Sequence, residues 1–87
     1  MSMDPLDQIL TRLEGKSRQN KLDHDTACVS VGNRTLLFHA HGANQENLVV
    51  LELRDGAMPI LADCRLSAPA SLDRLWEALG MPLCGRP

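Results

Sequence analysis

The chain has 87 residues, of which 44% are hydrophobic and 23% are charged, and its formal net charge is −2. This composition is typical of one small folded domain, and it provides no basic field that would attract nucleic acid. Phe38 and Trp76 are the whole aromatic content, too little for a base-stacking surface.

Two segments carry apolar residues at helical spacing. Asp4 and Pro5 favour a helix start, so we predict a first helix over Pro5–Glu14 and a second over Ser71–Leu79. Ser67 or Ser71 is the expected cap of the second helix. The two apolar stripes are Leu6, Ile9, Leu10 and Leu13, and Leu72, Leu75, Trp76 and Leu79.

Four strands are predicted between the helices, with tight turns at Gly32-Asn33 and Asp55-Gly56. The predicted strands are Thr26–Val31, Thr35–His41, Leu48–Leu53 and Met58–Leu66. Short turns favour a meander. Residues 1–87 are therefore expected to form a single α+β domain: an N-terminal helix, a four-stranded antiparallel sheet and a C-terminal helix, with both helices on one sheet face. The polar segment 16–25 and the terminal segment 81–87 are expected to be flexible.

The predicted sheet carries more apolar side chains than two helices can cover. The expected core face is Leu36, Phe38, Val49, Leu51, Leu53, Ile60 and Ala62. The opposite face then exposes Leu37, Leu48, Val50 and Leu61, with His39 beside them, and such a patch is typical of a protein contact. A self-complementary patch predicts a twofold homodimer, and an edge strand offers a place for an extended peptide. A loop or the sheet's twist could instead cover the patch in a monomer.

Several side chains are compatible with chemistry. His39 and His41 share a strand face and could bind a metal if His24, Asp23 or Asp25 approached, although two solvent-facing histidines give the same pattern. We expect neither metal nor cofactor.

Catalysis is not expected either. Cys28 could approach His39 across a hairpin, as a cysteine nucleophile requires, but Cys28 and Cys64 lie in apolar stretches that are typical of core cysteines. The odd number of cysteines, completed by Cys84, fits no disulfide framework and favours a reducing compartment. Nucleophile elbows, phosphate loops and dinucleotide fingerprints are absent from the sequence.

Charge and hydropathy also bear on partners. Arg12, Lys16, Arg18 and Lys21 form a basic run, but interspersed acidic residues favour a solvated surface over nucleic-acid binding. No run approaches the ~18 apolar residues of a membrane helix, and the N-terminus lacks a signal-peptide pattern, so we expect a cytoplasmic protein without a membrane partner.

The segments LDHDTACVSVGNRTLLFHAH and LVVLELRDGAMPILADCRLSAPASLDRLWEAL, after a leucine-striped helix, resemble the small bacterial type III secretion chaperones of the Tir-chaperone class. That family follows its first helix with an LD-x-x-G-x-C-x-L type strand; here Thr26-Ala27 replaces the glycine before Cys28, and the family's middle dimerisation helix has no counterpart. The resemblance implies a homodimer that holds a nonglobular effector segment without cofactor or catalysis. The alternative is a small regulator, inhibitor or immunity-type protein that binds one folded partner.

Overall fold

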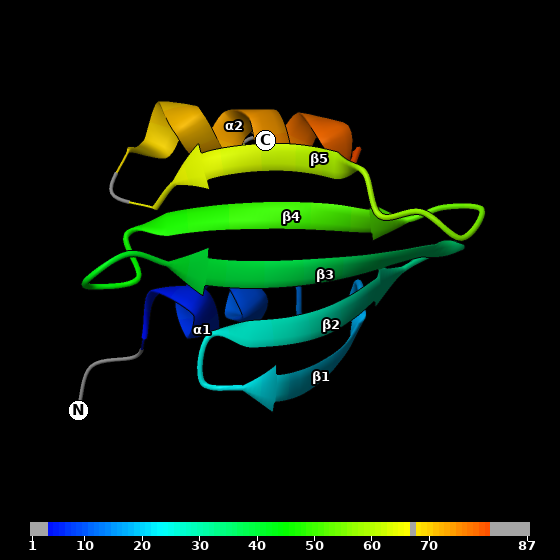
Figure 1. Ribbon diagram of the computed structural model, residues 1–87, viewed down its shortest axis with the longest axis horizontal. Helices are drawn as coiled ribbons and strands as arrows, with labels where there is room; N and C mark the ends of the chain where they lie inside the picture. Colours follow the sequence, from blue (N-terminus) through cyan, green and yellow to red (C-terminus); the bar gives the residue numbers. More distant parts are fainter. Residues whose placement is uncertain (1–3, 67, 81–87) are drawn as a thin grey trace.

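The computed structural model describes residues 4–66 and 68–80, which form a five-stranded sheet and two helices (Figure 1). In chain order the elements are α1 (Pro5–Arg12), β1 (Arg18–Asp23), β2 (Thr26–Val31), β3 (Arg34–His41), β4 (Asn47–Leu53), β5 (Ile60–Arg65) and α2 (Pro69–Ala78). Neighbouring strands are antiparallel and follow the order β1-β2-β3-β4-β5. The predicted α+β meander is confirmed, but the sheet has five strands instead of four.

The additional strand is β1, which the sequence analysis assigned to a flexible loop. All six of its residues are exposed, so its sequence RQNKLD has no buried alternation that would identify a strand. Backbone pairing with β2 forms it, from Arg18 opposite Ser30 to Asp23 opposite Thr26. Side chains on the helix-facing side also tie it to α1: Gln19 Nε2 donates to the Leu10 carbonyl at 2.7 Å, and Lys21 Nζ to Asp7 at 2.8 Å.

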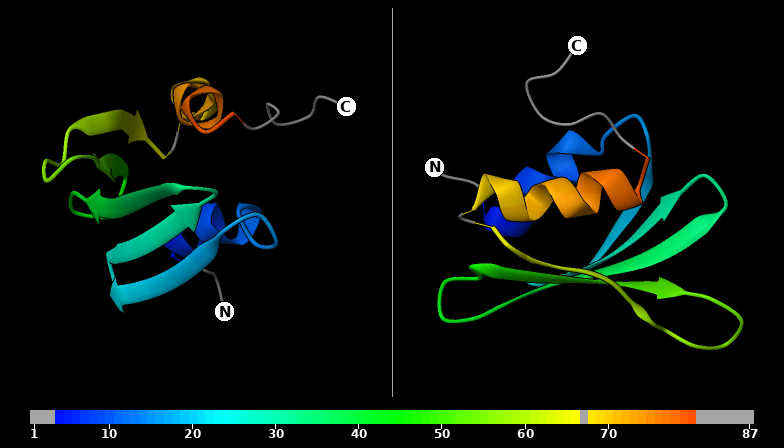
Figure 2. Two further views of the ribbon diagram at one scale, coloured as in Figure 1. Left: turned by 90° about the vertical axis from the view of Figure 1, so that its right-hand side faces the viewer. Right: turned by 90° about the horizontal axis from the view of Figure 1, so that it is seen from above.

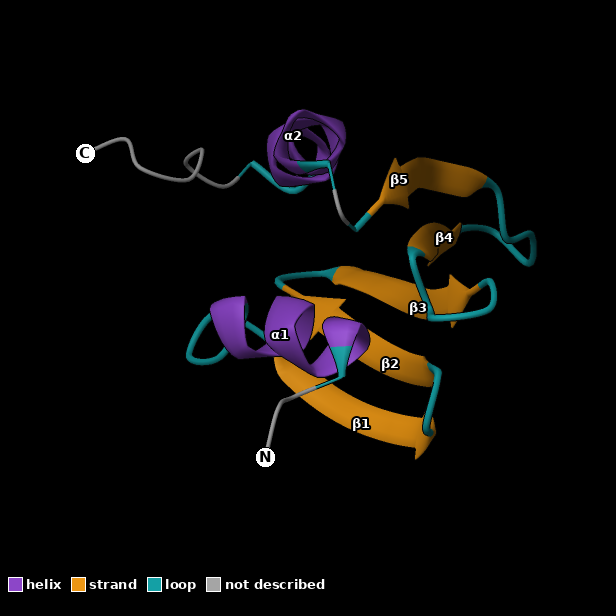
Figure 3. Ribbon diagram, turned by 90° about the vertical axis from the view of Figure 1, so that its left-hand side faces the viewer, coloured by secondary structure: helices purple, strands orange, loops and turns teal. Residues whose placement is uncertain are grey.

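Both helices lie on the same side of the sheet, with α1 over β1 to β3 and α2 beside β5 (Figures 2 and 3). Their predicted stripes pack against the sheet: Leu6, Leu13 and Leu75 are 0% exposed, and Leu72 alone of the eight is only partly buried. Arg12 on α1 reaches across to α2, where its guanidinium lies 4.8 Å from the Trp76 ring centroid, a cation–π distance.

The helix ends differ in detail from the prediction. Asp4 occupies the N-cap of α1, but its side chain makes no capping hydrogen bond. Ala68 is the N-cap of α2, and the Ser71 hydroxyl instead accepts a hydrogen bond from the Arg65 amide at 2.9 Å. Ser67 lies outside the described residues, as do segment 81–87 and Cys84. Neither described helix is long and apolar enough to cross a membrane.

The facing of β4 is the opposite of the predicted one. Leu48 and Val50 are 0% exposed beneath the helices, whereas Val49, Leu51 and Leu53 point to the other side. The sequence does not decide between the two alternations because LVVLEL is apolar at both parities, and the observed one requires that the charge of Glu52 be buried.

Two arginines make the burial of Glu52 possible. Glu52 is 7% exposed, and its carboxylate accepts hydrogen bonds from Arg34 at 2.9 and 3.2 Å and from Arg54 at 3.0 Å. Arg34 hydrogen bonding and charge lower the pKa of Glu52, so it is ionised. Arg34 also donates to the Ala78 carbonyl at 2.6 Å, which links this ion pair to the end of α2. The apolar pattern of β4 does not decide which alternate residues face the helices, and the paired charge of Glu52 therefore decides it.

Candidate functional site

The side of the sheet that faces away from both helices, here called the open face, has no described element packed on it (Figure 2). The strand register places four of its side chains side by side across neighbouring strands, because residues directly opposite one another in antiparallel strands point to the same face. Cys28 pairs with Leu37, Leu37 with Leu51, and Leu51 with Ile60. We call Cys28, Leu37, Leu51 and Ile60 the apolar row.

Rows that combine apolar, polar and charged side chains lie on either side of the apolar row. On one side, the register places Asp23, Thr26, His39, Val49 and Asp63 next to one another. On the other side it places Arg18, Ser30, Thr35 and Leu53 next to one another. Val49 and Leu53 widen the apolar centre, and charged side chains lie towards the outer strands. An apolar centre with a polar border is the usual composition of a protein–protein contact.

Exposure of this centre is largest at its β4 and β5 end. Ile60 is 65% exposed and Leu53 is 54% exposed, while Leu37, Val49 and Leu51 are partly buried by their neighbours in the sheet. Full burial of a large aliphatic side chain is worth about 1.5–3 kcal/mol, so Ile60 and Leu53 each leave about 1–2 kcal/mol of burial unused in the lone subunit.

The structure brings together two of the five predicted contact residues. Leu37 and His39 lie on the open face as predicted. The predicted exposure of Leu48 and Val50 is wrong, because both are core residues. The predicted outward position of Leu61 is also wrong: the register shifts between Val50 and Leu51, and Leu61 packs against the core.

Four open-face residues of β4 and β5 were assigned to the core by the sequence analysis: Val49, Leu51, Leu53 and Ile60. One signal could have placed three of them. Arg34 and Arg54 both pair with Glu52, the acidic residue of β4. If Glu52 faces inward to meet them, strand alternation places Val49, Leu51 and Leu53 outward. Ile60 follows Pro59, and the bulge that reverses its facing has no sequence signature of its own.

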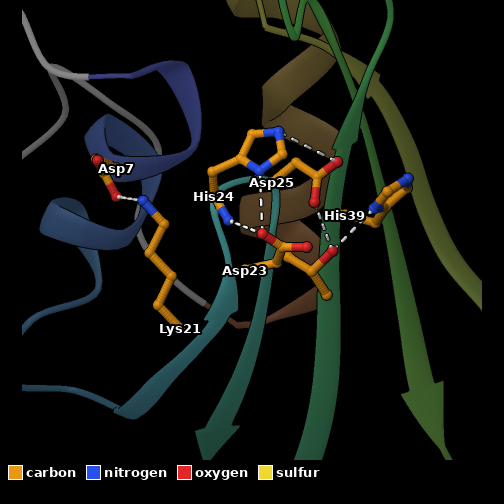
Figure 4. A network of polar contacts seen from close by, with 7 residues as sticks. Asp7, Lys21, Asp23, His24, Asp25 and His39 are labelled. Carbon is orange, nitrogen blue, oxygen red and sulfur yellow. Dashed lines mark hydrogen bonds and ion pairs between the residues drawn. The ribbon is translucent and has the colours of Figure 1, made fainter.

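A polar network lies at one end of the open face, around the β1–β2 turn (Figure 4). Asp23 accepts hydrogen bonds from the His24 backbone amide at 2.7 Å and pairs with His24 Nδ1 at 3.0 Å. Thr26 donates to Asp25 at 3.0 Å, and its Oγ1 lies 3.1 Å from His39 Nδ1. The hydrogen bond to Asp23 and the charge of Asp25 raise the pKa of His24. The hydrogen bond from the His24 backbone amide, and after it the one from the His24 ring, lowers the pKa of Asp23.

This network does not join the two strand histidines into a metal site. The rings of His39 and His41 stack with centroids 5.9 Å apart and an angle of 8° between their planes. Imidazole lone pairs lie in the ring plane, so nearly parallel rings do not direct them to one point between the rings. Among the described residues, Asp23, His24 and Asp25 are near enough to share an ion, but all belong to one exposed turn.

Among the described residues, neither Cys28 nor Cys64 is hydrogen-bonded to a base that would activate it as a nucleophile. Cys28 lies on the open face and is partly buried, which corrects its assignment to the core. His39, its predicted base, has Nδ1 directed to Thr26. Cys64 is buried as predicted, and burial raises the pKa of its thiol and disfavours the reactive thiolate.

A groove of about 380 Å³ lies on the helix side of the molecule, between the two helices and the β3–β4 loop. Ile9, Leu66 and Leu72 contribute apolar lining, and Arg12 and Glu46 contribute opposite charges. The Glu46 carboxylate accepts a hydrogen bond from the Asn44 amide at 2.8 Å, which lowers its pKa and keeps it ionised. This groove is distinct from the open face and remains accessible when that face is covered.

No protein-family model matches this chain, and comparisons with curated proteins and with solved structures give no match either.

Proposed function

We propose that this chain is a non-catalytic protein-binding module whose binding surface is the open face of the sheet. The observation that carries the proposal is the apolar row, a continuous line of four side chains across β2 to β5 on the side that faces away from both described helices. Burial of Leu53 and Ile60 by a partner would recover part of the hydrophobic free energy that the lone subunit leaves unused.

The shape of the sheet favours a folded partner over a peptide that adds a strand. Strand addition needs a regular free edge. Of the two edge strands, β1 carries Arg18, Lys21 and Asp23 and its register shifts between Lys21 and Asp23, while α2 lies beside the β5 edge (Figure 1). Edge charges and irregularities of this kind oppose strand addition. The partner proposed here is therefore a folded protein surface with an apolar centre and a mixed-charge border, as for a regulator, inhibitor or immunity-type protein.

A second candidate is the role implied by the resemblance to type III secretion chaperones, namely holding a secreted effector segment in the cytoplasm. The groove between α1 and α2 favours it, since its apolar lining and its charged Arg12 and Glu46 suit a short amphipathic segment. This role places the segment on the helix side rather than on the open face. The two candidates are separable because their surfaces lie on opposite sides of the sheet.

Variant-dependent capture tests the proposal. The immobilised wild-type chain is compared with Leu51→Asp, which places a charge in the apolar row, and with Ala70→Asp, which adds the same charge at an exposed site on α2. We expect one folded partner to be retained by wild type and Ala70→Asp but not by Leu51→Asp. Hydroxyl-radical footprinting of the purified complex should then protect Leu53 and Ile60. Retention that is lost with Leu72→Asp and kept with Leu51→Asp would support the groove instead.

A further inference from the structure

The rows of the open face are arranged so that the face is complementary to itself. Two copies can meet face to face about a twofold axis in the plane between them, and this axis can run along the strands or across them. The two directions bring different side chains together, so the charges on the face distinguish between them.

An axis across the strands, along the apolar row, stacks that row on the same row of the second copy. It also exchanges the two flanking rows. Val49 then faces Leu53 of the second copy, and Asp23 faces Arg18 of the second copy. The twofold axis repeats each contact, which gives two apolar contacts and two opposite-charge contacts at the border.

An axis along β3 gives the opposite result. It exchanges the outer strands, so that Asp23 on β1 faces Asp63 on β5 of the second copy, twice. It also sets the polar Asn20 against the exposed Ile60. Like charges facing one another and an apolar side chain opposite an amide both oppose association. The charge pattern therefore selects the axis along the apolar row.

The shape and size of the sheet are compatible with this packing. A twofold axis across the strands carries a twisted sheet onto a surface with the same twist, so the two faces remain parallel. Five strands of about 20 Å length at ~4.8 Å spacing present roughly 400 Å² in projection, before side-chain relief is counted. A standard interface buries about 800 Å² of accessible surface on each partner. Because the open face presents less area than this in projection, we expect a dimer that dissociates on dilution.

We propose that the open face binds a second copy of this chain about a twofold axis along the apolar row, with Asp23 of each copy paired to Arg18 of the other. This inference rests on the proposed function and names its partner. The dimer leaves both helix-side grooves facing outward, because the grooves lie on the far side of each sheet.

Sedimentation equilibrium of the full chain, from about 1 μM to about 1 mM, tests this assignment. Wild type and Ala70→Asp should dimerise alike, and Leu51→Asp should remain monomeric throughout. Arg18→Asp alone should weaken the dimer about tenfold, because two attractive pairs become repulsive. The double variant Arg18→Asp with Asp23→Arg should recover most of the affinity, a recovery that loss of folding cannot mimic.

Each other outcome is decisive. A wild-type chain that is monomeric at every concentration overturns the inference, and so does a dimer that tolerates Leu51→Asp. A dimer that depends on Leu51 but is not restored by the charge swap overturns the proposed axis. If the chain is monomeric while capture of a different protein still requires Leu51, self-association fails and the proposed function stands. If neither property depends on Leu51, both fail.

Discussion

Paired alanine substitutions on β4 should separate the two faces of the sheet by their effect on stability. Leu48 is 0% exposed beneath the helices, and Leu51 lies on the open face. Leu48→Ala removes a fully buried side chain from a packed core, which typically costs about 2–5 kcal/mol. Leu51→Ala removes a partly exposed side chain without leaving an enclosed cavity, and should cost about 1 kcal/mol in the monomer.

Urea denaturation followed by Trp76 fluorescence measures this difference. Trp76 is the single tryptophan and is 2% exposed, so its emission reports unfolding of the core. The expected gap of about 1–4 kcal/mol would correspond to roughly 4–30 °C in melting temperature for a domain of this size. Val50→Ala and Val49→Ala provide a second matched pair. Low protein concentration keeps association from stabilising wild type. An effect of Leu51→Ala equal to or greater than that of Leu48→Ala would show that the assigned facing of β4 is incorrect.

Three further perturbations test the polar interactions and the turns. Arg34→Met should lower the urea midpoint at about pH 7 and lower it less in acid. The reason is that the stabilisation from ionised Glu52 exists above the unfolded carboxyl pKa and disappears as pH falls through the lowered folded pKa. An equal loss at both pH values would contradict this. His24 has a pKa raised by Asp23, so its contribution is complete below the ordinary value of 6.5 and is lost as pH rises through the folded value. His24→Gln should therefore flatten the decline in stability between about pH 6 and pH 8, and an unchanged profile argues against that contact. Gly42→Ala should cost about 1–2 kcal/mol, because its φ of +101° is a backbone conformation that residues with a Cβ rarely adopt, whereas the Glu46 carboxylate, 2.6 Å from the added Cβ, ends a flexible side chain that can shift; a neutral effect in urea unfolding would refute the strain.

The sequence predicted correctly those elements that depend on the spacing of neighbouring residues along the chain. The stripe of Leu6, Ile9, Leu10 and Leu13 identified α1, and Gly32-Asn33 identified the turn between β2 and β3. Periodicity worked for β3 because its helix-facing residues are apolar while its other face includes two histidines. The surplus of apolar side chains on the sheet could also be predicted, since it depends on their number and not on their facing.

The errors arose where tertiary contacts decide. β1 is a strand through backbone pairing at an exposed edge, and its side chains give no periodic signal. The facing of β4 depends on Arg34, eighteen positions before Glu52 in the chain, coming within 2.9 Å of that carboxylate. The position of Ile60 depends on a register shift between β4 and β5. None of these features follows from hydrophobic periodicity. The sequence therefore predicted an apolar contact surface on the sheet, but it assigned some residues of that surface to the core and some core residues to the surface.

The central claim is that the open face is the surface on which this chain binds protein. Concentration-dependent methyl NMR tests it directly, through the shifts of leucine, valine and isoleucine methyl groups on dilution of the wild-type chain. The account predicts that the shifts concentrate on Leu37, Leu51 and Ile60, while Leu48 and Val50 remain nearly constant. Shifts confined to methyl groups of α1 and α2, or none at any concentration together with none on adding a captured partner, would contradict it.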